Sequence, residues 1–152
     1  MNTIKLIFCT TDGPVSWAIR AETNSQWSHV GFVDGDIVVE SISKQGVHEE
    51  PLASRQAASS KWQLVELECA DPEAVLAAAR TQLGKPYDYS AVLDIAIRDR
   101  DDWQDERSWF CSELVAWALD KGGSPKFRRS GVGRITPDHV WMLAPASAET
   151  GV

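Results

Sequence analysis

A β-hairpin signal in the first third of the chain limits the possible folds more than any other part of the sequence. The runs WSHVGFV (27–33) and DIVVESI (36–42) are rich in β-branched and aromatic residues, and Asp34-Gly35 separates them. An Asp-Gly dipeptide between two such runs is the strongest short-range indication of a hairpin, because glycine supplies the positive φ that a tight turn requires. We therefore predict two antiparallel strands here, with Asp34 and Gly35 as the turn residues.

The turn also sets which residues face each other across the hairpin. If Val33 pairs with Asp36, the ladder places His29 directly opposite Glu40 on one face of the sheet. A carboxylate beside an imidazole selects its tautomer and stabilises the imidazolium, which is the role of the third residue of a catalytic triad. Gly31, on the same face, leaves room for a ligand or another backbone segment. A slip of one residue would turn Glu40 to the opposite face, and a surface His–Glu pair without chemistry is the alternative interpretation.

The rest of the chain predicts an α+β fold with a mainly antiparallel sheet. Asp71 is a helix N-cap, Pro72 suits the first turn that follows it, and Gly84 ends that helix. Strands come early and helices late, without a linker or an internal repeat, so residues 1–152 are expected to form one domain. The further strands are expected at 4–10, 46–51 (an edge or loop strand) and 61–69, and the helices at 14–22, 72–83, 90–97, 109–121 and 136–143, with a charged loop at 98–107.

Charge and composition exclude several classes of partner. The net charge is −7, and the basic cluster Lys126, Arg128 and Arg129 is interpreted as a solvated loop. Nucleic acid is therefore not an expected partner, since phosphate binding depends on clustered Lys and Arg. No run approaches the roughly 18 apolar residues of a membrane span, and the N-terminus lacks the apolar stretch of a signal peptide. We expect no membrane span and a cytoplasmic protein; no oligomeric state is indicated.

The three cysteines are not spaced as a disulfide framework or as a zinc site, so free thiols are expected and no metal is indicated. Cys9 and Cys69 fall in apolar strand patterns and are predicted to lie in the core. His48 and His139 have no obvious carboxylate at a useful spacing and are set aside as surface or packing residues.

Cys111 differs from the other cysteines because it begins a predicted helix in RSWFCSELVAW (107–117). With Ser108 as N-cap, Cys111 lies in the first turn, where the helix dipole and unpaired N–H groups favour the thiolate and can stabilise an oxyanion. Taken alone, such a cysteine is more often a small core residue. With His29 as a base and Glu40 as the group that orients it, a catalytic interpretation is the better one.

In chain order, the segments WSHVGFV, VVESIS, GKPYDYSAVLD and WFCSELVAWAL resemble the circularly permuted, NlpC-like branch of papain-fold cysteine hydrolases, to which lecithin–retinol acyltransferase is distantly related. The resemblance runs from about residue 3 to residue 143, including ITPDHVWML near the end. It implies a papain-like fold in which the nucleophile helix packs against the sheet. It also implies that Cys111 is the nucleophile, His29 the general base and acid, and Glu40 the residue that orients His29.

The resemblance further suggests that Tyr87, in GKPYDY, lines the pocket or donates to an oxyanion, with a purely structural role as the alternative. The implied reaction is amide hydrolysis through a thioacyl intermediate by a peptidase or amidase, with cell-wall peptides as one candidate substrate class. No metal or organic cofactor is implied. Two other functions stay open: an acyltransferase or thioesterase acting on a lipid or acyl substrate with the same triad, and a binding module of this fold without turnover.

Overall fold

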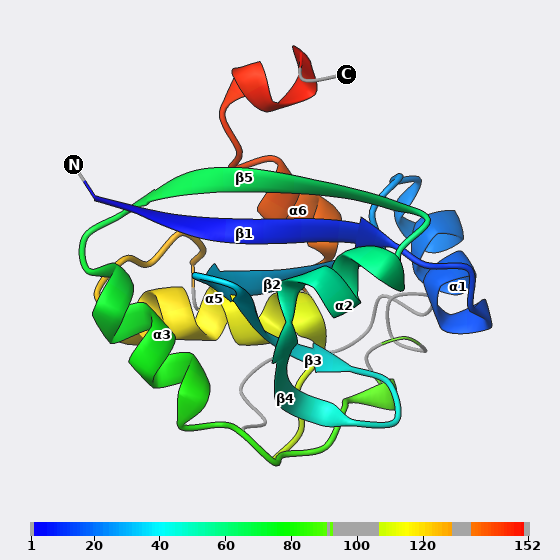
Figure 1. The fold of residues 1–152 in the computed structure, drawn as a ribbon, viewed down its shortest axis with the longest axis horizontal. Helices are drawn as coiled ribbons and strands as arrows, with labels where there is room; N and C mark the ends of the chain where they lie inside the picture. Colours follow the sequence, from blue (N-terminus) through cyan, green and yellow to red (C-terminus); the bar gives the residue numbers. More distant parts are fainter. Residues whose placement is uncertain (1, 91, 93–106, 129–134, 151–152) are drawn as a thin grey trace.

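The protein, described by a computed structural model for residues 2–90, 92, 107–128 and 135–150, has a mixed α+β fold. Its centre is a five-stranded antiparallel sheet with the strand order β4-β3-β2-β1-β5 (Figure 1), so the predicted class is confirmed. The strands are β1 (Asn2–Thr10), β2 (His29–Asp34), β3 (Ile37–Ile42), β4 (Gly46–Pro51) and β5 (Lys61–Cys69). The helices described are α1 (Pro14–Thr23), α2 (Leu52–Ala57), α3 (Pro72–Arg80), α5 (Cys111–Lys121) and α6 (Pro137–Trp141), followed by the 3₁₀ helix η1 (Ala146–Thr150).

The two faces of the sheet are covered differently. On one face, large side chains such as Phe8 and Phe32 join those of α3, α5 and α6 in the main apolar core. On the other face, Ile7 and Val38 belong to a smaller cluster, against which Leu52 of α2 packs. The helix that begins with Cys111 therefore packs against the sheet, and α2 covers the opposite side of the same strands.

The predicted hairpin is present, but its turn is shifted by one residue. Asp34 pairs with Ile37, so the turn residues are Gly35 and Asp36, and the predicted turn of Asp34 and Gly35 is wrong. Gly35 has a φ of 61°, as a type II′ turn requires at its first central position. The dipeptide correctly located the hairpin but did not fix its register.

The corrected register changes the relation between the two predicted site residues on this hairpin. Extending it from the Phe32–Val39 pair places Gly31, and not His29, opposite Glu40. A Cβ atom built on Gly31 would lie 3.0 Å from the Cβ of Glu40, which confirms that the two positions face each other. A turn shifted by one residue moves each cross-strand pairing by two positions. Because that shift is an even number, Glu40 stays on the same face of the sheet as His29. The two residues are diagonal neighbours, not direct partners.

Most of the other elements agree with the sequence prediction. The strands at 4–10, 46–51 and 61–69 are present, with β4 at the edge of the sheet. Asp71 caps α3 by accepting a hydrogen bond from the Ala74 N–H at 3.0 Å, although the regular helix ends at Arg80 and not at residue 83. Helix α2 was not predicted, since no side chain caps it. Most of the predicted helix at 90–97 and of the charged loop at 98–107, and Arg129, lie outside the described residues.

None of the helices in these described ranges has the length and apolar character needed to cross a bilayer.

Candidate active site

The predicted base and its orienting carboxylate are in contact. His29 is the first residue of β2, and its Nε2 is hydrogen-bonded to Oε2 of Glu40 in β3. Both side chains are buried: 9% of the His29 side chain and none of the Glu40 side chain is exposed. The alternative interpretation was a His–Glu pair on the protein surface, where both side chains would be solvated. The burial of both side chains distinguishes this pair from such a surface contact.

A third residue, Arg55, completes the group. It lies on α2, and its Nε and Nη2 donate to Oε1 of Glu40 at 2.9 and 2.7 Å, while Nη2 also donates to Glu50 on β4 at 2.5 Å. Two parallel hydrogen bonds from one guanidinium fix a carboxylate in position as well as neutralising it. Sequence reasoning missed Arg55, because a short helix without a capping residue gives no indication that an arginine on it is buried.

The electrostatics keep Glu40 ionised. Burial alone would raise its pKa, but the charge and hydrogen bond of His29, together with Glu50 and Arg55, outweigh burial and hold the pKa of Glu40 below its usual range. The pKa of Glu50 is instead raised, first by its own burial and then by the neighbouring Glu40. When a proton is taken up by these two carboxylates, it therefore goes to Glu50 and leaves Glu40 charged beside His29.

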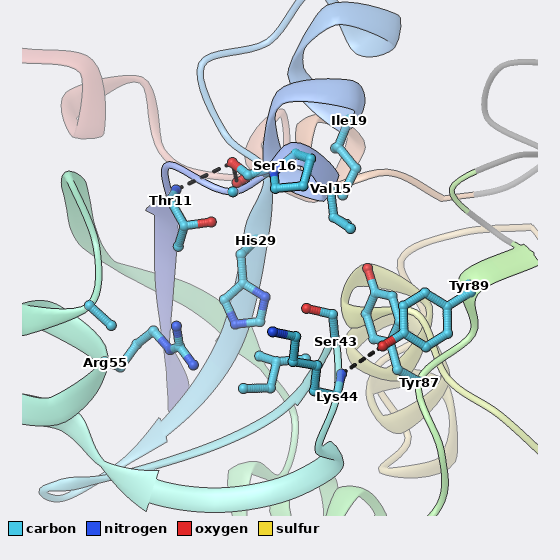
Figure 2. Close-up of a pocket in the computed structure, with 15 residues that line it drawn as sticks. Thr11, Val15, Ser16, Ile19, His29, Ser43, Lys44, Arg55, Tyr87 and Tyr89 are labelled. Carbon is cyan, nitrogen blue, oxygen red and sulfur yellow. Dashed lines mark hydrogen bonds between the residues drawn. The ribbon is translucent and has the colours of Figure 1, made fainter.

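A cavity of about 410 Å³ opens beside His29. Figure 2 shows the imidazole in the middle of this space, with Arg55 on one side and the two tyrosines, Tyr87 and Tyr89, on the other. Val15 and Ile19, from α1, form an apolar part of the wall. The only His29 nitrogen with a hydrogen-bond partner among the described residues is Nε2, so Nδ1 is free to act on a bound molecule.

Tyr87, the predicted pocket residue, does line this cavity and is 8% exposed. Its ring packs edge-on against Tyr89, at 5.0 Å between centroids, and against Phe110, at 5.9 Å. Burial raises the pKa of Tyr87, which keeps its hydroxyl protonated and therefore a hydrogen-bond donor. The aromatic packing of Tyr87 agrees with a structural role, and its position in the cavity wall agrees with a role in the pocket.

Cys111 begins helix α5, but Ser108 does not cap it. The N-cap is Phe110, and no side chain accepts a hydrogen bond there. The reason is that Trp109 pairs with the 86–88 segment: its N–H donates to Pro86 O, and its carbonyl accepts from Asp88 N–H, both at 3.0 Å. That pairing keeps the backbone extended through Trp109, so the helix starts two residues later than expected, and Cys111 still lies in the first turn.

The sulfur of Cys111 lies against the backbone on both sides of His29, at the start of β2. It is 4.0 Å from the carbonyl oxygen of Ser28, and it accepts from the backbone of Val30. Burial raises the pKa of the thiol to about 12, and the backbone hydrogen bonds of Val30 and Ser112 offset this only in part. The expectation that the helix start makes Cys111 a ready thiolate is thus opposed by desolvation.

No hydrogen bond joins the side chains of Cys111 and His29 in the described part of the chain. The two side chains start from opposite sides of β2. His29 pairs with Cys9, which belongs to the α2-side cluster, whereas Cys111 belongs to the main core. The structure thus brings His29 and Glu40 together and sets the sulfur beside the His29 backbone, but it does not join all three predicted residues in one hydrogen-bonded chain.

His48 was wrongly set aside as having no carboxylate nearby. It is the direct cross-strand partner of Glu40, and its Nε2 lies 3.5 Å from Glu40 and 3.7 Å from Glu50. The strands 37–42 and 46–51 flank a three-residue connection, and pairing them from Ile42 and Gly46 outward sets Glu40 opposite His48, so the sequence carried the signal. The other residues set aside behave as packing and capping groups: Cys9 and Cys69 are buried free thiols, and His139 forms a capping box with Thr136.

Glu40, His48 and Glu50 each offer one atom of a potential metal site, within 4.8 Å of one another. The chemistry of this set is unfavourable, however, because Arg55 already donates to the same oxygens of Glu40 and Glu50. A divalent cation would have to displace a buried guanidinium or share its ligands with a like charge. The residues present therefore do not fit a metal site in this arrangement.

Comparison with known proteins gives a similarity in structure. No protein-family model matches the chain, and no curated protein matches it. Among solved structures, the chain is similar to the metalloprotein yiiX from Escherichia coli O157:H7, described as DUF1105. The two share 26% sequence identity with a TM-score of 0.62, over 84% of this chain and 68% of the other. This similarity agrees with the mixed α+β fold described above.

Proposed function

We propose that this protein is a cysteine hydrolase of the permuted papain-like, NlpC-like type, with Cys111 as nucleophile, His29 as general base and acid, and Glu40 as the residue that orients His29. The observation that carries the proposal is the buried chain from Arg55 through Glu40 to His29, which ends at a cavity. Burying charged groups costs free energy, so titratable groups assembled in this way beside a cavity are typical of functional sites.

The tautomer of His29 follows from its contact with Glu40. A carboxylate accepts but does not donate, so Nε2 carries the proton and Nδ1 is left as the basic nitrogen. In the proposed first step, Nδ1 takes the proton of the Cys111 thiol as the sulfur attacks a carbonyl carbon. Glu40 stabilises the imidazolium that forms, and backbone N–H groups at the start of α5 stabilise the oxyanion.

The imidazolium then returns its proton to the leaving amine, the C–N bond breaks, and a thioacyl enzyme remains. Water, deprotonated by His29, hydrolyses the thioester and restores the thiol. For the first step, the sulfur has to turn from Ser28 O toward Nδ1 of His29. That movement also takes it out of the buried position that raises its pKa, so thiolate formation and alignment with the base occur together.

A second candidate is a binding module of the same fold without turnover. The observation in its favour is the state of Cys111, which is 2% exposed, has a raised pKa and makes no hydrogen bond with the His29 side chain in the described structure. In this case the cavity binds an acyl or peptide group, and the thiol contributes only to the core.

Metal-dependent chemistry is not included in the proposal. The similar structure is named a metalloprotein, but Arg55 occupies the carboxylate oxygens of the nearest equivalent cluster in this chain. In the proposed mechanism, Glu40 already acts as the hydrogen-bond partner of His29, so its burial needs no metal to account for it.

Alkylation by iodoacetamide separates the two candidates. We would follow the peptide that contains Cys111 by mass spectrometry in the parent protein, in His29→Ala and in the matched control His48→Ala, which also removes an imidazole next to Glu40. A hydrolase predicts that Cys111 is alkylated near neutral pH and that only the His29 change slows this by at least tenfold. Alkylation that begins only at strongly alkaline pH in all three proteins would establish the binding module instead.

A further inference from the structure

The cavity beside His29 differs in charge from the rest of the molecule. The chain carries a net charge of −7, yet among the described residues no aspartate or glutamate lines this cavity. The permanently charged side chains in the described part of its wall are two cations, Arg55 and Lys44. A concave surface with charges of one sign attracts ligands of the opposite sign.

The two cations are not equivalent. Arg55 is neutralised by Glu40 and Glu50. Lys44, in contrast, forms no ion pair with any residue that the structure describes, and its backbone N–H is the only group that makes a hydrogen bond, to the hydroxyl of Tyr89 at 2.8 Å. Figure 2 shows this contact, with Lys44 on the part of the wall close to His29. Within the described structure, Lys44 is therefore the uncompensated positive charge of the cavity.

The backbone at Lys44 is also unusual. Its φ is 73°, in the left-handed region, where glycine or asparagine is the favoured residue because a larger side chain crowds the backbone. The hydrogen bond that the Lys44 N–H donates to the Tyr89 hydroxyl and the tight β3–β4 connection hold this conformation. Lysine has no advantage for such a turn, whereas the turn directs this residue to the mouth of the cavity. Strain at a ligand-facing position is typical of functional sites.

We propose that Lys44 determines specificity by binding an anionic group, a carboxylate or a phosphate, on the substrate next to the bond that Cys111 attacks. This inference rests on the proposed hydrolase function and names its substrate class: acyl compounds that carry a negative charge close to the scissile carbonyl. The apolar wall formed by Val15 and Ile19 would contact the uncharged part of the same molecule.

A matched pair of alkylating reagents tests this without a known substrate. Iodoacetate and iodoacetamide place the same reacting carbon beside either a carboxylate or a neutral amide. We would measure the rate at which each labels Cys111 in the parent, in Lys44→Asn, in Lys44→Arg and in the control Lys5→Gln. Asparagine removes the charge but suits the left-handed backbone, so Lys44→Asn is expected to fold with unchanged or higher thermal stability. The control removes a lysine outside the cavity.

We expect the ratio of the iodoacetate rate to the iodoacetamide rate to fall by about two- to fivefold in Lys44→Asn, as for one charge acting across a solvated cavity. The ratio should stay near the parent value in Lys44→Arg and Lys5→Gln, and the difference should shrink at high salt. A ratio unchanged in Lys44→Asn, with labelling still dependent on His29, would overturn this inference and leave the hydrolase function standing. If neither reagent labels Cys111 near neutral pH, both proposals are wrong.

Added inorganic phosphate separates the two kinds of anion. If a carboxylate is the preferred ligand, acetate should slow iodoacetate labelling of the parent more than phosphate does at equal ionic strength; the opposite order would assign the site to phosphate. In Lys44→Asn, acetate and phosphate should slow iodoacetate labelling equally. Equal weak effects of both salts in the parent and in Lys44→Asn would contradict a specific role of Lys44.

Discussion

Arg55 donates two hydrogen bonds to a single oxygen of Glu40, from Nε at 2.9 Å and from Nη2 at 2.7 Å. The other oxygen of Glu40 is in contact with His29. The carboxylate therefore joins an arginine on α2 to a histidine at the start of β2, and neither side chain can move without changing the position of the other.

Replacing Arg55 with methionine should strongly destabilise the protein. The change keeps most of the side-chain volume but leaves Glu40 buried without its cationic partner, and breaking a buried ion pair in this way costs about 3–5 kcal/mol. Urea unfolding would measure the loss. The control is Arg80→Met, which removes a more exposed guanidinium that pairs with Asp34 and Glu49 and should cost at most about 1 kcal/mol. Similar losses for the two variants would mean that Arg55 is not part of a buried network.

The stability of the protein should fall in acid through Glu40. Its pKa is held below the ordinary value in the folded state, so the folded state binds fewer protons at this site than the unfolded chain. This contribution is present above the unfolded pKa of about 4.3 and is lost as the pH falls from there toward the lowered folded value. Glu40→Gln should flatten this acid dependence, measured as the free energy of unfolding between neutral and acid pH.

Glu50 serves as the comparison for Glu40, because its pKa is raised in the folded state and its linkage has the opposite sign. Its ionisation opposes folding as the pH rises through its folded pKa, so Glu50→Gln should make the acid loss steeper or leave it unchanged. If Glu50→Gln flattened the profile and Glu40→Gln did not, the assignment of charge between the two carboxylates would be wrong.

Gly31→Ala should disturb the site with little effect elsewhere. The new methyl group would lie 3.0 Å from the Cβ of Glu40 and from Cγ1 of Val38, close enough to push the carboxylate away from His29. Overpacking of this kind costs about 1–3 kcal/mol, and we expect the His29-dependent alkylation of Cys111 to slow by more than tenfold. Gly13→Ala is the control, since its Cβ meets no atom within 4 Å. Equal rates of Cys111 alkylation in Gly31→Ala and Gly13→Ala would indicate that Glu40 does not orient His29.

Gly46→Ala should be among the most damaging single changes in the sheet. Its Cβ would lie 2.2 Å from the carbonyl oxygen of Lys85, and its φ is 70°. Gly35 has a similar φ of 61° but no atom within 4 Å of an added Cβ, so Gly35→Ala isolates the backbone cost, about 1–2 kcal/mol. Chemical denaturation should show a clearly larger loss for Gly46→Ala. If the two losses were equal, the contact between β4 and Lys85 would be looser than described.

Local signals predicted most of the fold. The turn dipeptide, the proline and aspartate at the start of α3, and the alternating strands are each readable within a few residues of sequence. What failed was the register of the hairpin, because Asp34-Gly35-Asp36 allows two turns and only the sheet as a whole selects between them. The face of Glu40 survived the error because the shift was even.

The candidate site was only partly predictable for a different reason. His29 and Glu40 lie on one hairpin, so their contact follows from local pairing. Arg55 and Lys44 reach the site from a helix and a loop whose positions depend on tertiary packing, and no sequence spacing indicates that. Burial of Cys111 is likewise a property of how α5 packs against β2, and it outweighs the helix-start effect on which the sequence argument relied.

The covalent step offers the sharpest test of Cys111 as a nucleophile assisted by His29. Brief exposure to p-nitrophenyl acetate, followed by acid quenching and intact-mass analysis, would detect an acyl enzyme before water removes the acyl group. We predict a single acetyl group, located on Cys111, that disappears in Cys111→Ala and forms at least tenfold more slowly in His29→Ala. Acetylation that spares Cys111, or that reaches it at the same rate without His29, would contradict the proposed hydrolase.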